Sequence, residues 1–323
     1  MLDFEKEIVI IEENIAELRK KAQKDGIDLS SEIRQLGKKK TEALIRIYSC
    51  LTAWQIVQVA RHPQRPIFQD YANPVNSLVI EFMEFHGDRC FGDDRAIIAG
   101  LAKIGAHKVM LIGHNKGKTI KEKAACRFGS PCPEGFKKAH RVMKFAEKFG
   151  LPVVTLIDTP GAYPGMESEE RGVAKAIAEN LMLIATLKTP IVCIDIGEGG
   201  SGGALGIGIG DKFAMLEHSY FSVISPEGCA GILWREATLE NIKEAATALK
   251  ITSKELMSLG LIDDVIPEPL GGAHRSISET IANIKIYLCQ QLAKLKKIPI
   301  EKLIEIRQKK LRSLGTQFCK SPA

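Results

Sequence analysis

The residues best suited to chemistry form a glycine-rich run from Gly197 to Ala204, Gly-Glu-Gly-Gly-Ser-Gly-Gly-Ala. The apolar, β-branched stretch at 190–196 predicts a buried strand before it, and we expect a helix from Leu205 onward. The first amides of a helix have no internal acceptor and lie at the positive end of its dipole, so glycines there leave room for an anion. The run therefore predicts a site for a phosphate or an oxyanion. If the glycines serve only packing, the run is a tight turn from strand to helix.

Three other functions are compatible with the same run. Its Gly-x-Ser-x-Gly pattern is the nucleophile elbow of a serine hydrolase, and the candidate triad is Ser201, Asp263 or Asp264, and His274. A self-contained hydratase or isomerase would use Glu198 or Asp158 as acid and base. A non-enzymatic scaffold would tolerate a bulky side chain at Gly203. We expect Gly203→Val to abolish an activity that depends on backbone amides while leaving the assembly intact.

A similar unit precedes the glycine run. The stretch 153–157 predicts a buried strand, 158–165 has the turn sequence Asp-Thr-Pro-Gly-Ala-Tyr-Pro-Gly, and a long helix is expected over about 168–187. Two consecutive units of strand, glycine-bearing turn and helix predict that both turns stack at one edge of a parallel sheet.

Other elements must hold these turns in place. We expect a strand pair at 97–104 and 108–112, a helix over 133–150, strands at 212–216, 220–224 and 262–266, a turn at 225–228 and two helices at the end of the chain. The loop after Gly113 is one residue short of a phosphate-binding P-loop. Its basic residues are interpreted as solvated, and they are Lys116, Lys118, Lys121, Lys123 and Arg127.

The N-terminal part predicts a helical hairpin. Apolar residues recur at a spacing of three and four from Ile8 to Ala22, and a second apolar pattern continues from Ile33 to Ile56 before the prolines at 63 and 66. The narrow stripe of the first helix implies a partner helix, either in an assembly or within this chain.

Composition limits the class of protein. A chain of 323 residues with 45% hydrophobic content can bury a full core, and a net charge of +6 does not favour nucleic acid as a partner. Eight cysteines without a Cys-x-x-Cys pair indicate neither a zinc framework nor a secreted disulfide scaffold, so we expect a cytoplasmic location. We expect no signal peptide and no membrane span, since no run of 18 apolar residues occurs.

Nine motifs follow one another along the chain, at 86–89, 91–94, 113–123, 133–135, 157–165, 169–172, 197–204, 222–229 and 266–275. Together they resemble the carboxyltransferase alpha subunit of bacterial and plastid multi-subunit acetyl-coenzyme A (acetyl-CoA) carboxylase. The resemblance covers nearly the whole chain and is weakest after Arg275. It implies an α/β fold, the ClpP/crotonase-like ββα spiral. Residues 1–66 would be a helical hairpin and linker, 67–275 the carboxyltransferase core, and 276–323 C-terminal helices.

The resemblance also implies a reaction and its partners. A carboxyl group would move from carboxybiotin, on the biotin carboxyl carrier protein, to acetyl-CoA, giving malonyl-CoA for fatty acid synthesis. The chain would be active only with a carboxyltransferase beta subunit, as α2β2, and would work with biotin carboxylase in a system that binds ATP and other nucleotides. The beta subunit would carry a zinc ribbon, and this chain no metal.

The same resemblance implies the site residues. An oxyanion hole for the ureido oxygen of biotin would consist of backbone amides, those of Gly202, Gly203 and Ala204. Which adjacent pair of amides points inward stays open. The pocket on the biotin side would be lined by Gly161, Ala162, Gly199, Gly200, Ser201, Pro226, Glu227 and Gly228. Because biotin itself would act as the base, no catalytic histidine is expected.

Overall fold

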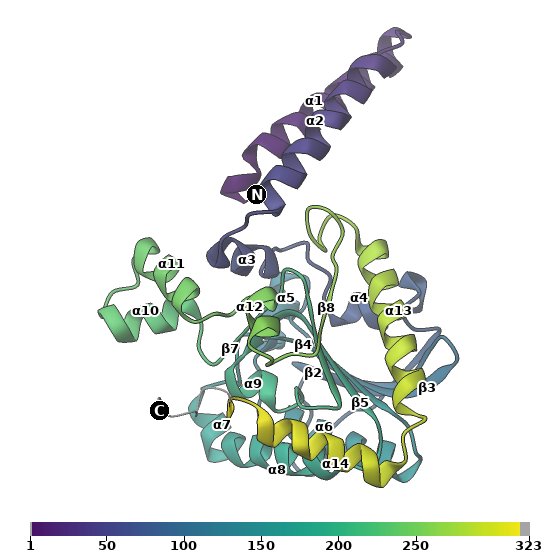
Figure 1. Ribbon diagram of the computed structural model, residues 1–323, viewed down its shortest axis with the longest axis vertical. Helices are drawn as coiled ribbons and strands as arrows, with labels where there is room; N and C mark the ends of the chain where they lie inside the picture. The colour runs from purple at the N-terminus through teal and green to yellow at the C-terminus, as the bar shows by residue number, and fades with distance from the viewer. Residues whose placement is uncertain (1, 317–323) are drawn as a thin grey trace.

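A single mixed sheet organises the chain in the computed structural model, which describes residues 2–316 (Figure 1). The described strands are β1 (Glu81–Glu84), β2 (Ile97–Ile104), β3 (His107–His114), β4 (Val153–Thr159), β5 (Ile191–Gly200), β6 (Lys212–Leu216), β7 (Tyr220–Ser222) and β8 (Asp264–Ile266). Their order in the sheet is β1-β2-β3-β4-β5-β6-β8, and β7 pairs with the end of β5.

The centre of the sheet is parallel, from β3 through β4, β5 and β6 to β8, and β1, β2 and β3 form an antiparallel edge. Every residue of β4 and of β5 is buried, as expected for strands covered on both faces. Helices α6 (Pro133–Lys148) and α8 (Val173–Thr186) cover one face, and α13 (Ile277–Leu295) covers the other (Figure 1). The predicted strand pair after Ile97 and the predicted strands at 153–157 and 212–216 are confirmed.

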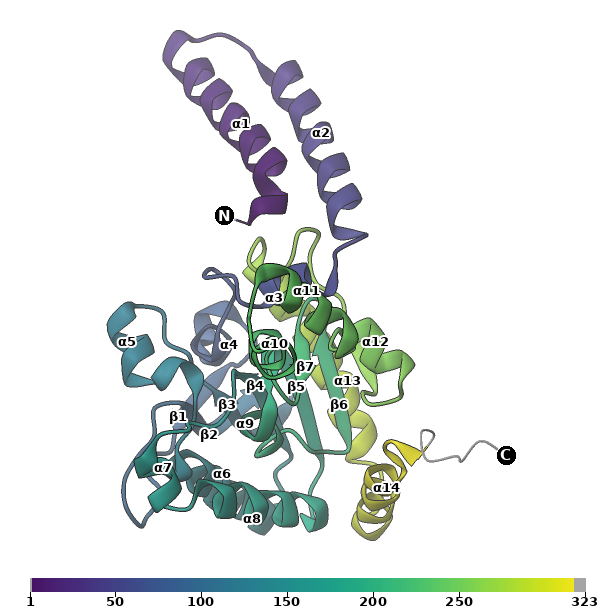
Figure 2. The same ribbon diagram turned by 90° about the vertical axis from the view of Figure 1, so that its left-hand side faces the viewer.

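The N-terminal hairpin projects from this body (Figures 1 and 2). Its helices are α1 (Lys6–Asp25) and α2 (Ser30–Tyr48), and α1 ends at Gly26, which has a left-handed conformation. At the base of the hairpin, Ile8 packs in one cluster with Leu44 and Tyr48 of α2 and with Val59 of the body. The partner helix implied by the apolar stripe is therefore α2 of the same chain at this end.

Three predicted boundaries were wrong. The second hairpin helix does not reach Ile56, because Thr52 caps a new helix, α3 (Ala53–Ala60), through a reciprocal pair of bonds with Gln55. The helix expected over 168–187 is broken at Gly172, whose φ of 79° is left-handed, into α7 (Met166–Glu170) and α8. The turn at 225–228 is the capped start of α10 (Pro226–Trp234).

The glycine run also differs from expectation. The strand does not end at Ile196 but continues as β5 to Gly200, because residues 198–200 pair with β7. The helix that follows, α9 (Ser201–Leu205), contains Gly202 and Gly203 and is short. The glycines thus form the end of a strand and the whole first turn of a helix.

The remaining elements connect and cover these layers. They are η1 (Asp3–Glu5), η2 (Pro74–Asn76), η3 (Arg127–Gly129), α4 (Phe68–Ala72), α5 (Ile120–Ala125), α11 (Leu239–Ala248), α12 (Ser253–Ser258) and α14 (Ile300–Ser313). The two predicted C-terminal helices are confirmed as α13 and α14. Among the described residues, no single helix is long and apolar enough to cross a membrane; α2 and α3 meet that test only when taken together, and they are bent by 118°.

Candidate active site

The candidate site lies where β4 and β5 end, at one edge of the sheet. A Cβ atom placed on Gly200 would lie 2.2 Å from the carbonyl oxygen of Pro160, and one on Gly203 would lie 2.5 Å from the carbonyl carbon of Gly161. The turns after the two strands therefore pack backbone against backbone. This confirms that they share one edge of the sheet, and it explains why Gly200 and Gly203 have no side chain.

Helix α9 begins with backbone amides that have no carbonyl acceptor outside the helix, as far as the described residues show. The first amides of a helix have no intrahelical partner. Within residues 2–316, no backbone hydrogen bond joins the N–H of Gly202, Gly203 or Ala204 to a carbonyl outside α9. Gly203 and Ala204 are buried, whereas Gly202 is partly exposed. Of the three predicted donors, Gly202 is therefore the one closest to solvent.

A buried histidine lies beneath these amides. His114, at the end of β3, has its Nδ1 3.4 Å from the backbone N–H of Asp158, and the N–H of Gly203 is directed at the same ring. Burial lowers the pKa of His114 to about 3, which keeps the ring neutral at pH 7. Its Nε2 has no partner within hydrogen-bond distance among the described residues. The Gly203 amide therefore faces the protein interior.

This geometry corrects the expectation for Gly203→Val. A Cβ at this position would overlap the backbone of Gly161 and would lie 2.6 Å from the amide nitrogen of Ala162. Backbone atoms on both sides cannot move away without displacing a whole turn. A valine at Gly203 is therefore expected to disturb the fold itself, whatever chemistry the site performs.

A cluster of charged side chains, here called the charge cluster, fixes the ends of the strands. It consists of Arg61, Lys116, Asp158, Glu198 and Glu227. The Nζ of Lys116 lies 2.6 Å from Oδ1 of Asp158 and also contacts Glu198. Arg61 donates to Glu198 through Nε at 2.6 Å and to Glu227 through Nη1 at 2.5 Å. The expectation that Lys116 belongs to a solvated loop was therefore wrong.

Electrostatics shift the pKa values of the two strand-end carboxylates in opposite directions. Burial alone would raise the pKa of Glu198, but Lys116 and Arg61 outweigh it and lower that pKa to about 2. The hydroxyl of Tyr220 also donates to Glu198, at 2.7 Å. At Asp158, burial dominates and raises the pKa, although Lys116 opposes it. Glu198 is thus held ionised, which does not suit a general acid.

A bulge in β5 brings these groups to the site. Ile157 pairs with Asp195 but Thr159 pairs with Gly199, so the chain between Asp195 and Gly199 bends out of register with β4. Oδ1 of Asp158 accepts the N–H of Glu198 at 3.0 Å, and Nε of Arg65 donates to the carbonyl of Ile196 at 2.7 Å. Side chains from two other segments therefore hold the bulge.

A pocket of about 420 Å³ opens beside the charge cluster. Its walls include Arg61, Lys116, Lys123, Phe128, Asp158, Pro160 and Glu198. None of the predicted glycines lines it, although Asp158 and Glu198 lie on the strands that carry them. From the sequence these two carboxylates were candidates for acid and base in an alternative function, and this pocket was not predicted. The sequence did contain one indication of this pocket, because Arg61 and Lys116 lie in segments that the resemblance covers.

The segment after Ser225 contributes the third part of the predicted pocket. Ser225 caps α10 by accepting the N–H of Gly228 at 3.0 Å, and Pro226 is buried. Glu227 belongs to the charge cluster through Arg61. The start of α10 is thus tied to the end of β5 through Arg61, which contacts both Glu227 and Glu198.

The serine hydrolase interpretation receives no support. Within the described part of the chain, no hydrogen bond or ion pair joins Ser201 to His274, or either of them to Asp263 or Asp264. His274 stacks on His62 near Glu5, and Asp263 pairs with Lys310 of α14. The three residues contact different parts of the chain.

Known proteins are similar to this chain over nearly its whole length. Residues 1–315 match the family described as acetyl co-enzyme A carboxylase carboxyltransferase-like. The chain is 52% identical over 314 residues to the acetyl-coenzyme A carboxylase carboxyl transferase subunit alpha of Rhodopirellula baltica, which covers 97% of each chain. It is 51% identical to the subunit of the same name from Methylococcus capsulatus, over 97% of this chain and 96% of the other.

Solved structures establish the fold. A Pseudomonas malonate decarboxylase hetero-tetramer in complex with coenzyme A superposes with a TM-score of 0.55 at 15% identity, over 71% of this chain and 91% of that chain. The transcarboxylase 12S hexamer superposes with a TM-score of 0.53 at 20% identity, over 66% and 41%. The expected crotonase-like fold is confirmed.

Proposed function

This chain belongs to the acetyl-CoA carboxylase carboxyltransferase family, as an alpha-type subunit, and we propose that it provides the biotin side of an active site completed by a beta subunit. In this proposal a carboxyl group passes from carboxybiotin to acetyl-CoA, and the product is malonyl-CoA. The substrate is carried over from the names of close relatives, and the roles of individual residues are argued below from their geometry.

The observation that carries the assignment of residues is that a side chain at Gly202 would meet no backbone. A Cβ there would meet only Cδ1 of Ile177, at 3.4 Å, whereas one on Gly200 or Gly203 would collide with backbone. Gly202 does not have a left-handed φ, so its conformation would allow other residues. Packing thus explains the glycines at 200 and 203 better than the one at 202. Close approach of a ligand to the backbone at position 202 would explain why this residue is glycine.

The amide of Gly202 would donate to the ureido oxygen of the biotin ring. When bound, carboxybiotin supplies the carboxyl group and the base that takes a proton from the acetyl methyl group. A fixed N–H aimed at a developing oxyanion stabilises it by about 3 kcal/mol, because the donor needs no reorganisation. Ala204 is the candidate for a second donor, while Gly203, whose N–H faces His114, would hold the turn in place.

The charge cluster would act as a rigid support for these amides. Glu198 lies two residues before Gly200, and its carboxylate is held by three donors, from Arg61, Lys116 and Tyr220. Such bracing keeps the strand end and the amides that follow at fixed positions during the reaction. The turn at Gly161 and Ala162 packs against α9 and would complete this side of the pocket.

The partners belong to the same proposal. A beta subunit would bring the acetyl-CoA side and its own zinc, in an α2β2 assembly. The biotin carboxyl carrier protein would deliver carboxybiotin, and biotin carboxylase would consume the ATP. We place all of them in the cytoplasm with this chain, on the basis of the family alone.

The test is to mix this chain with a zinc-bearing beta subunit and to measure malonyl-CoA formation from a carboxybiotin donor, with each chain alone for comparison. Gly202→Val should lower kcat by about 100-fold, as expected for the loss of one oxyanion donor, and leave the thermal midpoint within about 2 °C. A matched control is Gly37→Val, at a glycine of α2 with open space around it, which should retain its rate.

Two results would contradict the proposal. Normal turnover by Gly202→Val would remove the assigned role of this amide. If no malonyl-CoA formed with any beta subunit of the family, the proposed function would be wrong. Gly203→Val is included to separate packing from chemistry, since it should lower the thermal midpoint whether or not the activity is as proposed.

A further inference from the structure

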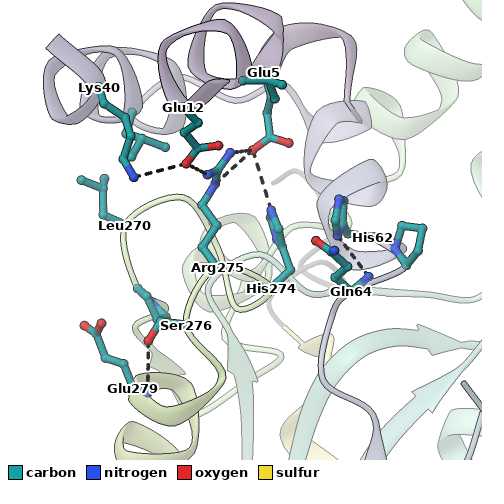
Figure 3. Close-up of a pocket in the computed structure, with 14 residues that line it drawn as sticks. Glu5, Glu12, Lys40, His62, Gln64, Leu270, His274, Arg275, Ser276 and Glu279 are labelled. Carbon is teal, nitrogen blue, oxygen red and sulfur yellow. Dashed lines mark hydrogen bonds and ion pairs between the residues drawn. The ribbon is translucent and has the colours of Figure 1, made fainter. Parts of the chain in front are cut away.

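A second, larger pocket lies where the hairpin meets the body, away from the glycine run (Figure 3). Its volume is about 810 Å³. Its walls come from α1 and α2 of the hairpin, from the segment 62–64 and from the loop 269–276 that leads into α13. The carboxyltransferase mechanism proposed above uses none of these residues.

Two imidazole rings and a carboxylate meet in this pocket. The rings of His62 and His274 stack with their centres 4.0 Å apart, and Nε2 of His274 lies 3.7 Å from Oε1 of Glu5. One ligand atom from each of the three residues lies within 4.8 Å of the others. Figure 3 shows Glu5 reaching from the hairpin toward His274. Segments far apart in the sequence thus bring two nitrogen ligands and one oxygen ligand together.

His274 requires an explanation, because its side chain is 4% exposed and neither ring nitrogen has a hydrogen-bond partner among the described residues. Buried polar groups are nearly always paired, and an unpaired one costs free energy. Glu5 lies too far from the ring for a hydrogen bond, at 3.7 Å. A ligand that accepts the lone pair of an imidazole nitrogen would remove this cost.

The charges around the pocket favour a cation. Three carboxylates and two cationic side chains line it, so these five side chains together carry a net negative charge. These residues are Glu5, Glu12, Glu279, Lys40 and Arg275. The two cations are already engaged, Arg275 with Glu5 and Glu12, and Lys40 with Glu12, at 2.8 to 3.2 Å. A small anion would find no unpaired positive side chain in this wall.

The backbone segments that carry the two histidines are anchored before any ion binds. His62 follows Arg61, which is anchored in the charge cluster, and His274 follows Ala273, whose N–H is held by Glu268 at 2.7 Å. Glu268 is itself buried in an ion pair with Arg65.

Glu5 is oriented as well. Its Oε1 accepts from Tyr48 and Arg275, both at 2.8 Å, which leaves Oε2 for a metal. Ligands that are carried on anchored segments reduce the free-energy cost of ordering a metal site.

We propose that Glu5, His62 and His274 form a binding site for one divalent transition-metal ion, with Zn²⁺ the best match. Imidazole ligands select zinc and its neighbours over magnesium or calcium, which prefer oxygen. Three protein ligands and a water from the pocket complete a four-coordinate site. The two rings stack with an angle of 29° between their planes, so one ring must turn before a nitrogen of each points at the same ion. Nδ1 of His62 accepts the N–H of Gln64 at 3.2 Å, which leaves its Nε2 for the ion. The ion would tie the base of the hairpin to the body.

The first experiment measures zinc binding directly. The full chain is treated with chelator, desalted and titrated with ZnCl₂ by calorimetry at pH 7.5. One site per chain is expected, with at least tenfold weaker affinity in His62→Gln and in His274→Gln. His86→Gln is the matched control, because His86 is 67% exposed and lies 3.2 Å from Asp93 and 3.5 Å from Glu84. This control should bind as the unmodified chain does.

A second measurement protects the test against variants that fail to fold. Titration of the unmodified chain with Co²⁺ should give the visible absorption of a four-coordinate site with nitrogen and oxygen ligands, and Zn²⁺ should displace it and raise the thermal midpoint. Three results would overturn the proposal: no visible band, unchanged zinc affinity in both folded histidine variants, or binding that disappears when the exposed Cys50 and Cys90 are alkylated.

Discussion

Lys116→Met tests whether the charge cluster holds the site together. Methionine has nearly the length of lysine without its charge, so the substitution removes the cation while filling most of its space. Lys116 is 17% exposed, and the carboxylates that it bridges, Asp158 and Glu198, are 5% and 9% exposed. Without Lys116 these two buried carboxylates would share no cation, and Arg61 would remain as the only cationic partner of Glu198 in the cluster.

The expected loss of stability follows from this burial. Breaking a buried ion pair by removing one partner costs about 3–5 kcal/mol, because a charge is left without compensation. An unfolding entropy of about 2.1 cal/mol/K per residue gives about 0.7 kcal/mol/K for a chain of this length, so the thermal midpoint should fall by roughly 4–7 °C at pH 7.5. The fall in the thermal midpoint should be smaller near pH 5. Burial already raises the pKa of Asp158, and protonation of this carboxylate would relieve its repulsion with Glu198.

The assay is differential scanning calorimetry of three chains at both pH values. Lys121→Met is the matched control, since Lys121 lies in the same basic loop but is exposed, and its midpoint should stay within about 1 °C of the unmodified chain. The double variant Lys116→Met/Glu198→Gln should recover part of the loss because one of the two uncompensated charges is gone. Equal midpoints for Lys116→Met and Lys121→Met would refute the argument.

Two further predictions concern other buried charges. Arg307→Met should cost about 3–5 kcal/mol in urea unfolding, because Asp211 and the carbonyls of Ile184, Leu187 and Thr189 all lose their donor; a loss below 1 kcal/mol would contradict this. The lowered pKa of Glu198, about 2 against an ordinary 4.5, means that its stabilising contribution is complete above pH 4.5 and is lost as pH falls toward 2. Glu198→Gln should therefore flatten the curve of unfolding free energy against pH in that window, and an unchanged slope would exclude this origin.

Local patterns were sufficient for much of the fold. The strands at β4 and β6 are continuous apolar runs bounded by glycine or proline, and such runs form buried strands wherever neighbours cover them. The repeated unit of strand, turn and helix correctly predicted that the turns at Gly161 and Gly203 meet. In both cases the signal lies within a few residues of the structure that it specifies.

The end of β5 shows where local patterns fail. Gly199 and Gly200 have low strand propensity, yet they pair in the sheet with Phe221 and Ser222 of β7. Pairing with a later strand, and the support of the bulge by Arg65, depend on contacts that no short window contains. The helix break at Thr52 was different, because its capping pair with Gln55 is local and was visible in the sequence.

The charge cluster could not have been found from spacing. Arg61 and Glu198 are 137 positions apart, and Lys116 is 82 positions from Glu198. A lysine in a basic loop is usually solvated, and only the folded chain shows that this one is buried against two carboxylates. The same holds for Glu5, His62 and His274, which come from three segments of the chain.

The glycines illustrate how structure divides a motif into separate tasks. From the sequence, Gly202 and Gly203 were assigned to the oxyanion hole and Gly200 to the pocket beside it. The space around each Cα separates them, because Gly200 and Gly203 are required for backbone contact and Gly202 is not. Since packing accounts for two of the three, only the third can report on chemistry. A substitution at Gly202 is therefore the informative one, and loss of activity at Gly203 would not distinguish an oxyanion hole from a turn that no longer closes.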